Sequence, residues 1–246
     1  GTKVMSQAAA VATSSHAERL DGELTSLATA QFETPEFRLF FETPLTMTRA
    51  RCYALQLVFY NVNRRDCWAY VQAKAPWEVK QAIWHHEDDE LHFDPRGGSD
   101  HRALMTKEAV ALGMTAEEVG MAQPTPLIRS LLAGFSFINI TQPWLGALAA
   151  SHFLERRNNS RLIRGGGFSA RWRDKAVREL KIEPSLLIST NVHVDADMDH
   201  SDSIWDSICR YVVDEFSYRT ALEGAQLCAL ADRAFRAGLA YEMRQH

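Results

Sequence analysis

Apolar residues recur at the three- and four-residue spacing of an α-helix along most of this chain, and the alternation typical of a β-strand is nowhere sustained. We detect no internal repeat. Of the 246 residues, 46% are hydrophobic, which is enough to build one large core. The sequence therefore predicts an all-α fold, a bundle of about seven or more helices, with residues 17–246 forming a single domain.

Prolines and capping residues divide the helical pattern into segments. Residues 115–118 read T-x-x-E, which is typical of a helix N-terminus, and residues 93–100 (FDPRGGSD) form the clearest turn. Residues 1–16 are expected to be a flexible start, with residues 1–4 an expression remnant before Met5. The predicted helices cover residues 17–30, 35–41, 47–73, 76–92, 100–112, 116–120, 125–141, 143–157, 168–181, 184–200 and 202–243.

Charge and composition narrow the classes of partner. The 27 basic and 31 acidic residues give a net charge of −4 without a long basic run, so neither nucleic acid nor a membrane surface is indicated. The most apolar stretch, residues 127–150, is interrupted by Arg129, Asn139 and Pro143, which favours buried helices over a membrane span. Four cysteines form no C-x-x-C pair. We expect a cytoplasmic protein that binds a small molecule.

The stretch HVDADMDH at residues 193–200 carries the strongest chemical signal. On a helix, His193, Asp197 and His200 fall on one stripe, while the other two aspartates point elsewhere. Apolar residues flank this stripe on the same side, and ionisable groups facing a core need partners. A solvated acidic face with two incidental histidines is the simpler interpretation. The triplet is better explained as three metal ligands.

A second group of candidate ligands surrounds the turn at residues 93–100. Glu90 lies near the end of one predicted helix and His101 at the start of the next, so the turn could bring both side chains to one point. A glutamate and a histidine are suitable ligands for iron or manganese. His86 and Glu87 lie one turn before Glu90 and could replace it as ligand or support it. The same acidic run is equally typical of a solvated helix end.

His152 interrupts the apolar, small-residue helix predicted at 143–157. A single buried histidine is more often a core residue with a satisfied hydrogen bond than a ligand. The three glycines at 165–167 are expected to form a flexible connection, because no strand precedes them and no Lys-Ser/Thr follows.

The order of these motifs resembles the heme-oxygenase-like diiron oxidases and oxygenases, which are related in fold to thiaminase-II and pyrroloquinoline quinone synthase. The motifs are DDEL, then DHRAL, a Gly-Ala-Leu helix with one internal ligand, and finally H-x3-D-x2-H. The stretch from PLTMTRARCY to DDELHF is similar to the entry region of that superfamily. The resemblance spans roughly residues 35–225.

The resemblance implies two Fe(II) ions as cofactors and O2 as cosubstrate. His152 stands where family members usually carry a bridging or terminal glutamate, and residues 47–73, from which some members supply another, contain no Glu. Loss of a bridging negative charge could make the second iron weakly or transiently bound. The implied metal ligands and catalytic residues are Glu90, His101, His152, His193, Asp197 and His200.

The resemblance further implies oxidation of amino acids, amines or fatty acids, by N-oxygenation, oxidative C–C cleavage or decarboxylation. Among these we expect a small amino-acid-derived substrate in a biosynthetic pathway. No flavin or nicotinamide motif is found, so electrons would come from an external reductant or from the substrate. Among four arginines in residues 161–173, Arg164 could bind a substrate carboxylate, and Tyr60 could line the cavity. A solvated basic face and core packing also explain these two residues.

Three alternatives remain. A thiamine-salvage hydrolase of the same fold would need a cysteine nucleophile, and none of the four cysteines lies in a recognisable activating motif. A non-catalytic helical protein would bind metal or a small ligand, or serve as a subunit of a complex, without consuming O2. Structural histidines would hold no metal at all. The predicted helix ending at 243 could serve a homodimer interface as well as a core.

Overall fold

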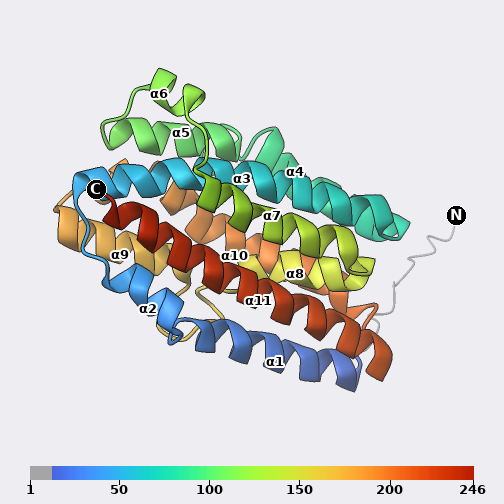
Figure 1. The fold of residues 1–246 in the computed structure, drawn as a ribbon. Helices are drawn as coiled ribbons and strands as arrows, with labels where there is room; N and C mark the ends of the chain where they lie inside the picture. Colours follow the sequence, from blue (N-terminus) through green and yellow to red (C-terminus); the bar gives the residue numbers. More distant parts are fainter. Residues whose placement is uncertain (1–12) are drawn as a thin grey trace, which may run out of the picture.

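The computed structural model describes residues 13–246, which form a bundle of helices (Figure 1). This part of the chain contains no β-strand, only an isolated bridge between Asp94 and Ser99. The predicted all-α bundle is therefore confirmed. Its eleven α-helices are α1 (Ser15–Gln31), α2 (Pro35–Glu42), α3 (Met47–Lys74), α4 (Trp77–Leu91), α5 (His101–Ala111), α6 (Ala116–Met121), α7 (Pro126–Thr141), α8 (Trp144–Arg156), α9 (Phe168–Leu180), α10 (Ile188–Cys209) and α11 (Glu215–Arg244).

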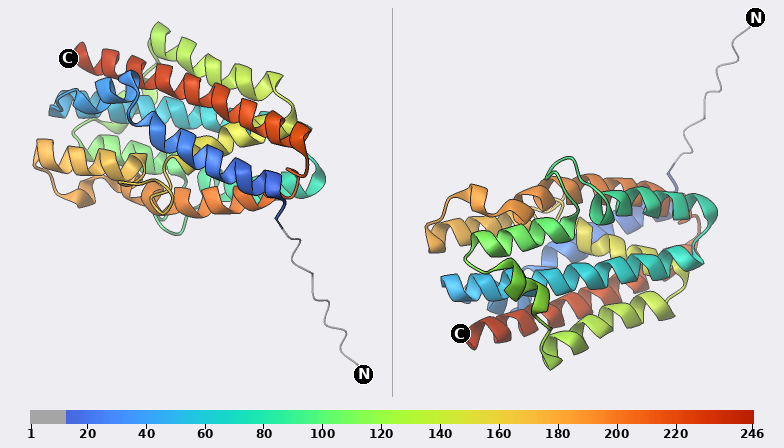
Figure 2. Two further views of the ribbon diagram at one scale, coloured as in Figure 1. Left: turned by 90° about the horizontal axis from the view of Figure 1, so that it is seen from below. Right: turned by 90° about the horizontal axis from the view of Figure 1, so that it is seen from above.

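The short helix α8 lies at the centre of the bundle. It packs against α11, α10, α3 and α7, and both views of Figure 2 show it between α10 on one side and α11 and α7 on the other. Every residue from Leu145 to Arg156 is buried. On the α10 side, α4 and α5 complete a group of helices that all contact α10. Side chains from α4, α5, α8 and α10 can therefore meet inside the molecule.

The predicted division between the last two helices is wrong. Pro184 begins a short 3-10 turn, so α10 starts later than predicted, at Ile188, and it continues to Cys209 because no Gly or Pro interrupts it. The break falls after Cys209, and the side chain of Asp214 caps α11 by accepting from Ser217 N at 2.8 Å. His200 consequently lies inside α10 rather than at its end.

Only residues 13–16 of the predicted flexible N-terminus are described by the structure. Residues 1–12, which include the predicted remnant at 1–4, lie outside the described residues. Helix α1 begins at Ser15, so the predicted flexible start does not reach residue 16; Ser14 Oγ accepts from Ala17 N at 3.1 Å. None of the described helices is both long and apolar enough to cross a membrane.

Helices α8 and α11 touch through their backbones at two glycines. A Cβ atom at position 224 would lie 2.0 Å from the Gly146 carbonyl oxygen, so only glycine permits this approach. The contact sets the depth at which α8, and the polar residues near its end, sit in the bundle.

We predict that Gly224→Ala lowers the free energy of unfolding by about 1–3 kcal/mol, because one of the two backbones must shift. The matched control is Gly134→Ala, since a Cβ at that helical position has no neighbour within 4 Å. This control should be neutral or stabilising by up to about 1 kcal/mol. Denaturant titration of both variants measures the difference. Equal stabilities would contradict the role assigned to the crossing.

Candidate metal centre

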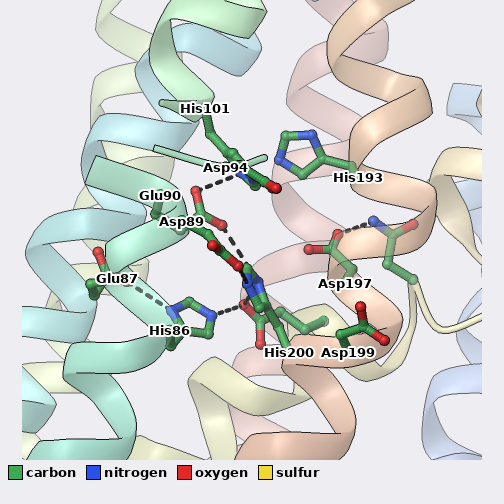
Figure 3. A network of polar contacts seen from close by, with 12 residues as sticks. His86, Glu87, Asp89, Glu90, Asp94, His101, His193, Asp197, Asp199 and His200 are labelled. Carbon is green, nitrogen blue, oxygen red and sulfur yellow. Dashed lines mark hydrogen bonds and ion pairs between the residues drawn. The ribbon is translucent and has the colours of Figure 1, made fainter. Parts of the chain in front are cut away.

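Six buried or half-buried side chains from four helices converge between α4 and α10 (Figure 3). We call them the histidine–carboxylate cluster. Potential ligand atoms of His86, Glu90, Glu155 and His200 lie within 4.8 Å of one another, and those of Glu90, His101 and His193 do likewise. Glu90 belongs to both groups. The cluster consists of His86 and Glu90 on α4, His101 on α5, Glu155 on α8, and His193 and His200 on α10.

Each histidine of the cluster uses one ring nitrogen to donate a hydrogen bond to an outer acceptor. His86 Nδ1 donates to Glu87 at 3.0 Å and His200 Nε2 to Asp89 at 2.9 Å. The remaining two donate from His101 Nε2 to Asp94 at 2.7 Å and from His193 Nδ1 to the Ser189 carbonyl at 2.8 Å. In a neutral ring the other nitrogen then carries the lone pair that can bind a cation.

The turn after α4 explains how His101 reaches the cluster. Asp100 caps α5 by accepting from Ala103 N at 2.9 Å, which places His101 in the first turn of the helix. The backbone of Asp94 pairs with Ser99, and its fully buried carboxylate faces His101. Arg96 Nη1 pairs with two of the outer acceptors, Asp94 at 3.1 Å and Asp89 at 3.3 Å. The predicted turn thus orients two histidines through one arginine.

Glu90 is held from the opposite side by helix α3. Its Oε2 accepts from Asn61 Nδ2 at 3.3 Å and lies 3.1 Å from Arg65 Nη1. Burial opposes ionisation of Glu90, but Arg65 and His101 outweigh it and bring the pKa of this carboxyl well below its usual value. Glu90 is therefore an anion in the folded protein.

Positive charge is required to balance the buried carboxylates. Burial alone would lower the pKa of His86, but Glu155 and Glu87 raise it to about 10. Burial likewise opposes protonation of His101, and Glu90 and Asp94 raise its pKa to about 9. Protons on these rings compensate the carboxylates when no cation is bound. A divalent metal can replace those protons, because ligating imidazoles are neutral.

Unpaired atoms show that the cluster fits metal ions. His101 Nδ1, His200 Nδ1 and Glu155 Oε2 are buried and have no hydrogen-bond partner among residues 13–246. His101 Nδ1 nevertheless lies 2.9 Å from Glu90 Oε2, outside hydrogen-bond geometry. Buried polar atoms without partners are costly, and coordination would satisfy all three. Mixed imidazole and carboxylate donors suit iron or manganese.

The structure brings together four of the six predicted ligands: Glu90, His101, His193 and His200. Asp197 is in neither group. It is buried on the same side of α10, as the helical spacing predicts, but its carboxylate accepts a hydrogen bond from Asn158 Nδ2. Its role as a ligand stays a prediction.

His152 is the predicted ligand that the structure places elsewhere. Its Nε2 accepts from Arg156 Nε at 2.9 Å, and its ring packs 5.9 Å from that of Trp205. Burial and the charge of Arg156 keep the pKa of His152 well below its usual value. The carboxylate that α8 contributes to the cluster is Glu155, and His152 is in neither ligand group.

Two members of the cluster were not among the predicted ligands. The sequence suggests His86 as a substitute for Glu90 or as a residue that supports it. In the structure its Nε2 is within hydrogen-bonding distance of Glu155 Oε1, which links α4 to α8. Glu155 lies in the sequence ERR at the end of an apolar helix, where charged residues are usually solvated. Glu155, Arg156 and Arg157 are nevertheless all buried, and the sequence alone does not show this.

A cavity of about 90 Å³ adjoins the cluster. Glu90, Glu155, His193 and Asp197 line one part of it. Tyr60 lines it as predicted, whereas Arg164 does not: it is exposed in the glycine-rich connection before α9. Arg164 is therefore not placed to bind a substrate carboxylate in this cavity.

These features define a helical protein with a buried histidine–carboxylate site of the kind that holds iron. The chain belongs to the family described as iron-containing redox enzymes, whose profile matches residues 51–233. A search of curated protein sequences gave no match.

Solved structures share the heme oxygenase-like fold at low sequence identity. A domain of unknown function from Shewanella denitrificans OS217 has a TM-score of 0.73 at 13% identity, over 92% of this chain and 93% of that chain. A CADD-like protein of unknown function from Nostoc punctiforme PCC 73102 has a TM-score of 0.64 at 16% identity, over 92% and 97%. A TenA homologue from P. horikoshii OT3 has a TM-score of 0.64 at 14% identity, over 92% and 99%.

We predict that Asp94→Asn lowers the affinity for Fe(II) about 10–100-fold, because the outer carboxylate orients His101 and increases its basicity. Asp195→Asn is the matched control, since this exposed aspartate lies on α10 outside both ligand groups. Anaerobic Fe(II) titration measures both affinities. An unchanged affinity in the Asp94 variant would show that His101 does not bind the metal.

Glu108 of α5 supplies a pH-dependent contribution to stability where α5 meets α10. Burial raises the pKa of this carboxyl to about 6, although Thr190 N and Oγ1 both donate to it. A raised carboxyl pKa means that the folded state binds the proton more tightly. The stabilisation is complete below the unfolded pKa near 4.5 and is lost as pH rises through about 6.

We therefore predict that Glu108→Gln loses less stability than the wild type between about pH 4 and pH 7, with a difference of up to about 2 kcal/mol. Urea unfolding of metal-free protein across this range measures the difference. Glu117→Gln, at an exposed position, serves as the control and should follow the wild type. Parallel curves for the Glu108 variant and the wild type would refute the assignment.

Proposed function

We propose that this protein is an O2-activating non-heme diiron oxidase or oxygenase that acts on a small amino-acid-derived substrate. The observation that carries the proposal is the pair of ligand groups sharing Glu90, in which every histidine has one nitrogen fixed by an outer acceptor. Membership of an iron-containing redox family supports it. N-oxygenation and oxidative C–C cleavage or decarboxylation are the proposed reaction types.

One proposed metal position lies among His86, Glu90, Glu155 and His200, and the other among Glu90, His101 and His193. Two ferrous ions there would supply electrons for the reduction of O2. The chain itself holds the ligands in place: Asn61 and Arg65 fix Glu90, and Arg96 fixes the outer carboxylates. Further electrons come from an external reductant or from the substrate.

The adjoining cavity would hold the substrate beside this centre. Glu90, Glu155 and His193 of the cluster line this cavity, and aromatic side chains from α3 and α9 line it as well. Apolar walls exclude water from the reacting bond and strengthen the electrostatic interactions inside.

We predict about two irons per chain after anaerobic Fe(II) loading, followed by O2 consumption with a transient visible absorption band on rapid mixing. His200→Ala should lower the iron content and abolish the reaction with O2, while circular dichroism shows unchanged helicity. Iron retained at the wild-type level in this variant would contradict the proposed centre.

Neighbouring histidines provide a matched comparison for the same measurement. His86 is buried in the cluster, whereas His85 is exposed on α4. We expect His86→Ala to lose iron and His85→Ala to keep it. Glu155→Gln should also lose iron, and His152→Gln should keep it. The opposite result for the last pair would restore the ligand set first inferred from the sequence.

A thiol-dependent hydrolase of the same fold is disfavoured by the cysteines. Cys52, Cys67, Cys209 and Cys228 do not line the cavity, and burial raises the pKa of each thiol. A non-catalytic metal-binding protein would bind iron in the loading experiment without consuming O2.

A further inference from the structure

The cavity that adjoins the cluster also reaches a group of buried arginines. Arg64 of α3, Arg157, which follows α8, and Arg236 of α11 all line it. Their exposed fractions are 5%, 4% and 1%. Guanidinium groups are rarely buried this completely unless they are paired.

Negative charge around these arginines is incomplete. Asp232 accepts from Arg157 Nε at 2.6 Å and from Arg236 Nε at 3.3 Å, so two guanidinium groups share one carboxylate. Arg64 Nη2 donates to the neutral hydroxyl of Ser151 at 2.8 Å and forms no ion pair within the described residues. The three arginines therefore face a single acid, and the group carries an excess of positive charge.

Two of these arginines also have unused hydrogen-bond donors. Arg64 Nη1 and Arg236 Nη1 are buried without a partner among residues 13–246. Aromatic rings compensate only in part: the guanidinium carbon of Arg236 lies 4.3 Å from the centroid of Phe168 and 5.2 Å from that of Phe235. A buried charged donor without an acceptor is costly, and an anionic ligand would satisfy it.

The part of the cavity wall that α3 supplies is mostly apolar and aromatic. Tyr53, Leu57, Tyr60 and Arg64 follow one another at three- and four-residue spacing along the cavity side of α3. Arg236 approaches the same stripe, with its guanidinium carbon 5.9 Å from the Tyr60 ring centroid. One cavity is thus lined by cationic donors, by apolar and aromatic side chains, and by members of the cluster.

We propose that Arg64 and Arg236 bind the carboxylate of the substrate, with the apolar part of that molecule lying along the α3 stripe Tyr53–Leu57–Tyr60. The substrate is then an organic acid with an apolar body, and its reacting carbon or nitrogen is set beside the cluster by this anchor. The assignment of a substrate rests on the proposed function, whereas recognition of the acid depends only on the arginines.

Four six-carbon probes test the proposal on the full chain: hexanoate, hexan-1-ol, hexylamine and hexyl phosphate. Binding is measured by calorimetry in the presence of a chelator, so that no metal can bind the acid directly. We expect hexanoate to bind at least about tenfold more tightly than hexan-1-ol, because charge-assisted hydrogen bonds replace unpaired donors. Hexylamine should bind least.

Arginine variants locate the effect. Arg64→Met and Arg236→Met should each abolish the preference for hexanoate over hexan-1-ol. Neither leaves a new unpaired buried group, because Ser151 still donates to Asn139 and Asp232 still accepts from Arg157 and Gln31. Arg164→Met, at an exposed position outside the cavity, is the control and should retain the preference. Circular dichroism verifies that each variant folds.

Three results would overturn the proposal: absence of measurable hexanoate binding, a preference that survives in both arginine variants, or tighter binding of hexyl phosphate. The iron and O2 measurements are made separately on metal-loaded protein. Acid binding without iron chemistry would refute only the diiron function, and iron chemistry without acid binding would refute only the anchor.

Discussion

Burial of the Glu90 and Glu155 carboxylates is the constraint on which the rest of the site depends. Two anions a few ångströms apart in an apolar interior repel each other and lose their hydration, so cations must accompany them. The chain supplies Arg65 and four histidines, and each histidine is oriented by an acceptor outside the cluster. Protons or metal ions can then provide the same compensation at the same atoms.

Close backbone contacts between helices place the Glu155 carboxylate in the interior. Glu155 lies in the interior because α8 is buried from Leu145 to Arg156, and α8 reaches that depth through its glycine contact with α11. A second close approach acts nearby, since a Cβ at Gly167 would lie 2.3 Å from the Asn158 carbonyl oxygen. That approach lets α9 begin beside Asn158, whose side chain donates to Asp197. Glycines at these close backbone contacts thus determine where Glu155 and Asn158 lie in the site.

Local sequence pattern was sufficient for part of the site and insufficient for the rest. Helical spacing placed His193, Asp197 and His200 on one buried stripe, and the turn at residues 93–100 correctly brought Glu90 to His101. On α8, both His152 and Glu155 are buried, and the sequence favours the histidine because it interrupts an apolar run. Which of the two faces the cluster depends on the rotation of α8 against α10 and α11, and that is a tertiary property. The buried arginines were missed for the same reason: Arg64 and Arg236 are distant in sequence and look like ordinary solvated residues on long helices.

The two regions that line the cavity differ in charge balance before any ligand binds. Asp232 leaves the arginine group with excess positive charge, while the cluster holds carboxylates that attract cations. A molecule with a single acid group can satisfy only the first region, so its apolar remainder is directed toward the second. Orientation then comes from the charge asymmetry of the cavity, and metal coordination is not needed to choose it. On this proposal, selectivity lies with the arginines on α3 and α11, and reactivity lies with the cluster.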